Sequence, residues 1–217
     1  MRRPPALHTM IDTQNMNSNT YIKPVRSLNI NENWKFRQLN STKPPRTVSQ
    51  FPTTVHLDLL HHNLIPDPSI LLNEKEAQWV GEEDWEYTTT ISASTLSHDS
   101  NPRHSTACML VFEGLDTFAT VRLNGRVILE SENMFVTHRV EIANLLRANP
   151  GADLELSIEF KSAFLKGKQL VEALPQHQWG CWNGDPSRLA VRKGSYYFRY
   201  SSLLLYPLDC KSCLAYL

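Results

Sequence analysis

The densest run of carboxylates in this 217-residue sequence is Glu82, Glu83 and Asp84, with Glu74 and Glu76 shortly before it. Two carboxyl groups can cleave a glycosidic bond when a rigid frame holds them about 5–9.5 Å apart and burial keeps one of them protonated. Consecutive residues of a turn diverge, so these acids cannot converge on one sugar. We expect a solvent-exposed acidic turn here and identify no catalytic residue in the sequence.

The histidines and cysteines do not form a metal or redox motif. His61 and His62 are adjacent, and adjacent side chains point apart rather than toward one ion. Cys210 and Cys213 have C-x-x-C spacing, but no second pair of ligands follows them. Cys108 lies in an apolar run and is interpreted as a small buried hydrophobe. The motifs H-E-x-x-H, G-x-S-x-G, G-x-G-x-x-G and the P-loop are absent from the sequence, so we expect neither a metal nor a cofactor.

One segment, 176–188, combines aromatic and hydrogen-bonding side chains. It contains Trp179, Trp182, Asn183 and Asp185. Aromatic faces stack on the C–H face of a sugar, and amide or carboxylate groups bond its hydroxyls, so these four residues are our candidate ligand-binding residues. The alternative is an ordered loop whose tryptophans pack onto the domain. We favour this alternative, because large aromatic side chains are usually mostly buried.

Charge and length exclude several classes of protein. The 22 basic and 22 acidic side chains cancel, which argues against nucleic acid or an anionic membrane as the main partner. The longest apolar run, 107–112, is far shorter than the roughly 20 residues of a membrane-spanning helix. The N-terminal residues lack the apolar core of a signal peptide, so we expect an intracellular protein.

Alternation of apolar and polar residues predicts β-strands along most of the chain. These strands are expected around 34–37, 85–92, 119–124, 136–142 and 154–160. The run 107–112 is apolar on both faces, which is typical of a strand at the centre of a sandwich. Asn124 and Gly125 predict a type I′ hairpin between 117–124 and 126–130.

Helical signals are short. We expect turns of helix over 73–80 and 142–147, and a longer helix up to residue 174 that Ser162 caps. Many antiparallel strands and few helices predict an all-β fold, a jelly-roll β-sandwich with a few short helices. The expected organisation is a disordered leader over 1–27, the sandwich over 28–200 with a Pro/Thr-rich linker-like stretch at 41–52, and an atypical C-terminal tail over 201–217.

Several segments, in a fixed order between about residues 28 and 197, resemble the N-terminal domain of β-mannosidases of the fungal, intracellular type. These enzymes are retaining exo-glycosidases of the β-galactosidase/β-glucuronidase clan. The matching segments are IPDP at 65–68, NE at 73–74, QWV at 78–80, DWEY at 84–87, FEGLDTFATVRLNG at 112–125, ENMFVTHRV at 132–140 and VRK at 191–193. The block at 112–125 is the most specific of them.

The resemblance implies a galactose-binding-like jelly roll. It also implies a family activity, hydrolysis of terminal non-reducing β-D-mannose by double displacement. Both catalytic glutamates of the family lie on a separate TIM barrel, and no glutamate here matches either of them, so we expect the activity to be absent from this chain. The family continues to a Trp-Asp-Trp-Gly-Pro motif, whereas this sequence differs over 196–206. We expect that a frame change, an unspliced intron or an early stop produced the tail.

Three functions stay open at this point. The chain is the non-catalytic sandwich of a β-mannosidase, a freestanding module that binds mannose-containing oligosaccharides, or a structural domain that interacts with other proteins. The third function predicts an exposed apolar surface, normally packed against other domains, that self-associates when bare.

Overall fold

The computed structural model describes residues 28–93 and 108–177. The leader predicted over 1–27 and the tail predicted over 201–217 lie outside these residues, and both stay predictions. Within the described residues, no helix is long and apolar enough to cross a membrane.

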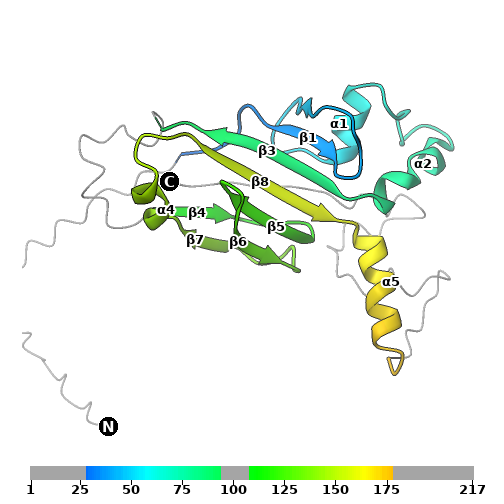
Figure 1. Ribbon diagram of the computed structural model, residues 1–217. Coiled ribbons are helices and arrows are strands. Elements are labelled where there is room, and N and C mark those ends of the chain that lie inside the picture. The colour runs from blue at the N-terminus through cyan, green and yellow to red at the C-terminus, as the bar shows by residue number, and fades with distance from the viewer. Residues whose placement is uncertain (1–27, 94–107, 178–217) are drawn as a thin grey trace, which may run out of the picture.

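A six-stranded antiparallel sheet forms the main layer (Figure 1). Its order is β2-β1-β3-β8-β5-β6, so strands far apart in sequence are neighbours at its centre. The strands are β1 (Lys35–Gln38), β2 (Arg46–Thr47), β3 (Trp85–Ile91), β5 (Phe118–Leu123), β6 (Arg126–Ser131) and β8 (Leu154–Lys161). The predicted strands are therefore confirmed in this layer.

A second, two-stranded antiparallel sheet pairs β4 (Met109–Phe112) with β7 (His138–Glu141). Leu110 and Phe112 are fully buried in the same core as the large sheet, whereas Met109 and Val111 are only half-buried. The interpretation of β4 as a strand at the centre of the sandwich therefore stays a prediction, because only its core-facing side is fully buried among the described residues. Within the described residues β4 pairs with β7 alone, and one of its faces turns to the core.

The inner face of the large sheet follows the period-two pattern. On β8, Leu154, Leu156, Ile158 and Phe160 are buried while the intervening Glu155 and Glu159 are not. Burying one such side chain contributes about 1.5–3 kcal/mol, so this face supplies much of the driving force for folding.

The β5–β6 hairpin confirms the predicted turn. Asn124 and Gly125 both have positive φ, at 49° and 75°, as a type I′ turn requires. The Asn124 side chain also accepts a hydrogen bond of 2.8 Å from the Glu155 backbone N–H, which ties the hairpin to β8.

Short helices lie at the ends of the strands (Figure 1). They are α1 (Val55–His61), α2 (Asn73–Glu76), the 3-10 helix η1 (Gln78–Glu82), α4 (Ala143–Ala148) and α5 (Ala163–Ala173). The three predicted helical segments are confirmed, and the Ser162 hydroxyl caps α5 by accepting a 3.0 Å hydrogen bond from the Leu165 N–H.

The sequence prediction missed β2 and α1. Strand β2 lies inside the stretch predicted as a linker, and among the described strands its two residues pair with β1 alone. Helix α1 places two polar residues, His56 and Asp58, on its buried side, so it lacks a clean apolar period.

Candidate functional site

The predicted ligand-binding residues Trp179, Trp182, Asn183 and Asp185 lie outside the described residues. Their role as sugar contacts stays a prediction. We therefore searched the described residues for other arrangements that could do chemistry.

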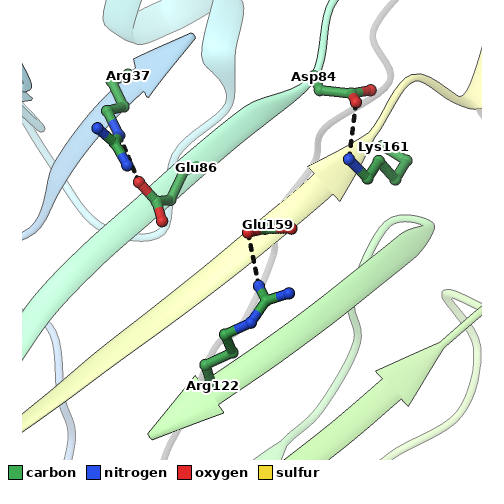
Figure 2. Close-up of polar contacts among 6 residues, drawn as sticks. All are labelled: Arg37, Asp84, Glu86, Arg122, Glu159 and Lys161. Atoms are coloured by element: carbon green, nitrogen blue, oxygen red, sulfur yellow. Dashed lines mark hydrogen bonds and ion pairs between the residues drawn. The ribbon is translucent and has the colours of Figure 1, made fainter. Parts of the chain in front are cut away.

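One pair of carboxylates lies side by side. In the β3–β8 register Glu86 is directly opposite Glu159, and among the paired positions of the described strands no other two acids face each other. Each has an arginine partner on the strand beyond it. Arg37 Nε lies 2.5 Å from Glu86, and Arg122 Nη1 lies 2.6 Å from Glu159 (Figure 2).

This arrangement is not that of a glycosidase. Each of these two carboxylates is held by an arginine, so neither is free to attack a sugar or to protonate a leaving group. The neighbouring arginines also neutralise both charges. We interpret the four side chains as two ion pairs side by side, with an arginine at each outer end, which offset the repulsion between the two adjacent acids.

The predicted acidic turn is only partly exposed to solvent. Asp84 bonds the Lys161 ammonium at 2.9 Å through one oxygen (Figure 2). Its other oxygen accepts the Ser162 N–H at 2.8 Å. Ser162 in turn donates to the Gly81 carbonyl at 2.6 Å. Asp84 thus joins the start of β3 to the start of α5, and the expectation of a wholly exposed acidic turn is wrong at this residue.

Two titratable groups are buried between α1 and the rest of the domain. Burial raises the pKa of the Asp58 carboxyl from 3.8 to about 6, although hydrogen bonds from Tyr87, Thr53 and the Ser49 backbone oppose this shift. The Tyr87 hydroxyl donates to Asp58 Oδ2 at 2.9 Å. The carboxyl is fully buried, so we assign it to the attachment of α1 to β3 rather than to chemistry on a ligand.

His56 has the opposite shift. Burial lowers the pKa of its imidazole from 6.5 to about 4, although a hydrogen bond with the Ala77 backbone opposes the change. Within residues 28–93 and 108–177, no group of three or more histidine, cysteine, aspartate or glutamate side chains is placed to hold a metal ion.

A surface cavity of about 130 Å³ lies at one end of β1. It is lined by the β1–β2 loop, the region where α1 ends, and the exposed Trp79 of η1. Sequence analysis missed it, because its walls come from separate segments that only the tertiary fold brings together. Trp79 contributed to the family resemblance, but its position in the sequence does not indicate a cavity.

A protein-family model matches most of this chain. The model for the glycosyl hydrolase 2 galactose-binding domain-like family covers residues 34–200. The match includes both described parts of the sandwich except for the first few residues.

Characterised proteins and solved structures give the same result. β-Mannosidase B of Thermothelomyces thermophilus is 52% identical over 172 residues, and that of Aspergillus fumigatus (strain Af293) is 41% identical over 171. Each alignment covers 78% of this chain and 19% of the relative. The crystal structure of a β-D-mannosidase from Dictyoglomus thermophilum superposes with a TM-score of 0.65 at 31% identity, covering 80% of this chain and 20% of that one. The chain spans about a fifth of the length of the relatives that it matches.

Proposed function

We propose a function from the premise that this chain belongs to the glycosyl hydrolase 2 galactose-binding domain-like family. It corresponds to the N-terminal, sugar-binding-like domain of β-mannosidases, and it covers only this domain. We infer that the domain is non-catalytic by itself. Hydrolysis of terminal non-reducing β-D-mannose, the activity that the resemblance implies, then requires groups other than these 217 residues.

The carboxylate geometry supports this proposal. The one opposed pair of acids among the described strands, Glu86 and Glu159, lies on one face of a sheet with an arginine beside each member. A glycosidase needs two acids on either side of the bond that breaks.

A β-mannoside hydrolysis assay on the purified 217-residue chain tests it. We expect no release of p-nitrophenol from p-nitrophenyl β-mannoside above the buffer rate. Turnover that disappears when one glutamate of this chain is changed, as in Glu86→Gln or Glu159→Gln, would overturn the proposal.

We further propose that the domain docks onto other protein domains through an apolar surface at Ile70, Leu71 and Leu72. These consecutive side chains are 52%, 89% and 64% exposed. Leu71 has a φ of 51°, a left-handed conformation that costs a leucine about 1–2 kcal/mol. Exposure and strain together do not stabilise the isolated domain, which supports a role in binding another surface.

The loop that carries this apolar surface is well tied by hydrogen bonds. Asp67 accepts from both the backbone N–H and the hydroxyl of Ser69, and the Asn73 side chain donates to the Asp67 carbonyl at 3.0 Å. Preorganised apolar side chains lose little entropy on binding, which favours docking.

Sedimentation of the isolated chain tests the docking surface, because a bare apolar surface should self-associate. We expect concentration-dependent association that Leu71→Asn abolishes, with stability unchanged or raised by up to about 1 kcal/mol since Asn tolerates this conformation. The matched control is Val127→Ser, which changes an exposed apolar residue on β6 and should still associate. A wild-type chain that stays monomeric at high concentration contradicts the proposal.

A second candidate function is sugar binding by a freestanding module. The exposed Trp79 beside a cavity supports it, since tryptophan faces stack on sugars. Calorimetry with mannose and β-mannobiose tests this candidate, and no heat at millimolar sugar would exclude it. An intracellular location and the lack of nucleic-acid and membrane partners stay predictions from the sequence.

A further inference from the structure

The cavity at the end of β1 has an apolar floor and one aromatic wall. Phe36, Leu59 and Trp85 are buried beneath it. Trp79 is 39% exposed, and its ring lies 6.1 Å from that of Trp85. A tryptophan that is supported from behind and open on another side offers a flat surface for a bound ring.

The rim of the cavity is basic. Arg37, Lys43 and Arg46 all contribute to its lining. Glu86 neutralises Arg37 at 2.5 Å, but no ion pair joins Lys43 or Arg46 to an acid of the described residues. Two positive charges that no acid of the described residues compensates, beside an aromatic face, favour a ligand with a negative charge.

Hydrogen-bonding groups complete the lining. The Gln38 amide and the Ser41 hydroxyl both border the cavity. The Ser41 hydroxyl accepts a 3.1 Å hydrogen bond from the Lys43 N–H, which fixes the loop that carries both residues. An amide and a hydroxyl can bond the hydroxyl groups of a ligand.

The size of the cavity suits one ring. Its volume is about 130 Å³, close to the roughly 150 Å³ of an engineered cavity that holds benzene. We propose that the cavity binds a single sugar ring that carries an anionic group, with the ring on Trp79 and the anion between Lys43 and Arg46. This goes beyond mannoside recognition, because mannose has no charge for the two cations to bind.

Titration of the ¹⁵N-labelled chain by NMR tests the proposal. The probes are glucuronate, which carries a carboxylate, glucose 6-phosphate, which carries a phosphate, and neutral glucose. We expect at least one anionic sugar to shift the Trp79 indole signal and to bind about tenfold or more tighter than glucose, as one charge-assisted hydrogen bond provides. The tighter of the two anionic sugars identifies the anion. Added NaCl should weaken the binding.

Variants distinguish the contribution of the Trp79 ring from that of the Lys43 and Arg46 charges. Trp79→Ala should reduce affinity for every sugar, with Trp79→Phe as a variant that keeps a ring and protects the fold. The double variant Lys43→Gln/Arg46→Gln should lose the preference for the anion and keep any glucose binding. The matched controls are Phe135→Ala and Lys168→Gln, which alter exposed residues elsewhere and should change nothing.

Three results would overturn the proposal. They are no binding of either anionic sugar at tens of millimolar, equal binding of glucose, and binding that the Trp79 and Lys43/Arg46 variants leave unchanged. The hydrolysis and sedimentation assays do not depend on this cavity, so its failure leaves the proposed function untouched.

Discussion

Two side chains on one helix respond to pH in opposite directions. Asp58 has a raised pKa in the folded protein, so its protonated form stabilises the fold below pH 3.8 and this contribution is lost as the pH rises through about 6. His56 has a lowered pKa, so its neutral form stabilises the fold above pH 6.5 and this contribution is lost as the pH falls through about 4. Between pH 4 and 6 the contribution of Asp58 to stability falls while that of His56 rises, so the two changes largely cancel.

Removing either side chain should reveal how the other one makes the unfolding free energy depend on pH. We expect Asp58→Asn to leave an unfolding free energy that rises with pH between 4 and 6.5, and His56→Gln to leave one that falls between 4 and 6. Each change is on the order of 3 kcal/mol across its window, from about 1.4 kcal/mol per unit of pKa shift. Urea unfolding at several pH values measures these free energies. If stability changed with pH in the same direction in both variants, the opposite effects of Asp58 and His56 would be contradicted.

The β5–β6 turn depends on one glycine at positive φ. We expect Gly125→Val to destabilise the domain by about 1–2 kcal/mol, because a branched side chain is strained in this conformation. No atom lies within 4 Å of an added Cβ, so the cost is conformational rather than a clash. The control is Gly125→Asn, since Asn tolerates positive φ. Chemical denaturation measures both variants, and an equal loss of stability in Gly125→Val and Gly125→Asn would show that backbone strain is not the cause.

At the scale of elements, the start of α5 depends on Ser162. Its hydroxyl accepts from the Leu165 N–H and donates to the buried Gly81 carbonyl, so it joins α5 to η1. We expect Ser162→Ala to cost about 1–2 kcal/mol, as an N-cap and a buried hydrogen bond are lost together. Ser69→Ala, which removes an exposed hydroxyl bonded to Asp67, should cost less than about 0.5 kcal/mol. Thermal melts of both variants make the comparison, and equal shifts would contradict this role.

Sequence alone predicted the elements whose signals are local. The alternation of apolar and polar residues predicted β3 and β8, Asn124–Gly125 predicted the hairpin, and Ser162 predicted the start of α5. Strand β2 was missed because two residues carry no period, and only pairing with β1 makes them a strand. Helix α1 was missed because its buried Asp58 reads as polar, and its partner Tyr87 is distant in sequence.

The candidate site was less predictable than the fold, for a physical reason. Trp79, Lys43 and Arg46 have no shared local pattern, and each looks like an ordinary surface residue in the sequence. The cavity exists because β1, β2 and the loop between them converge with α1, η1 and the start of β3. Similarly, the specific block at 112–125 places Leu115, Asp116 and Thr117 in the core, so the family motif here maintains the fold.

For the whole molecule, one continuous core joins the two sheets. Phe112 of β4 and Phe160 of β8 are both buried in it. We expect Phe112→Ala and Phe160→Ala each to cost about 3–5 kcal/mol. Because the core is shared, both variants should still unfold in one cooperative transition. Hydrogen exchange that opens the small sheet separately from the large one would contradict a shared core.

The central pairing of the large sheet also sets the order of events when the chain is made. Trp85 pairs with Phe160 and Ile91 with Leu154, so β3 cannot complete its pairing until β8, which is synthesised much later, is available. Until that strand has left the ribosome, β3 exposes an edge of unpaired peptide groups and its aromatic side chains lack their cover. Nascent chains halted before residue 154 should therefore bind chaperones. The chaperones should be released once β8 has been synthesised and pairs with β3.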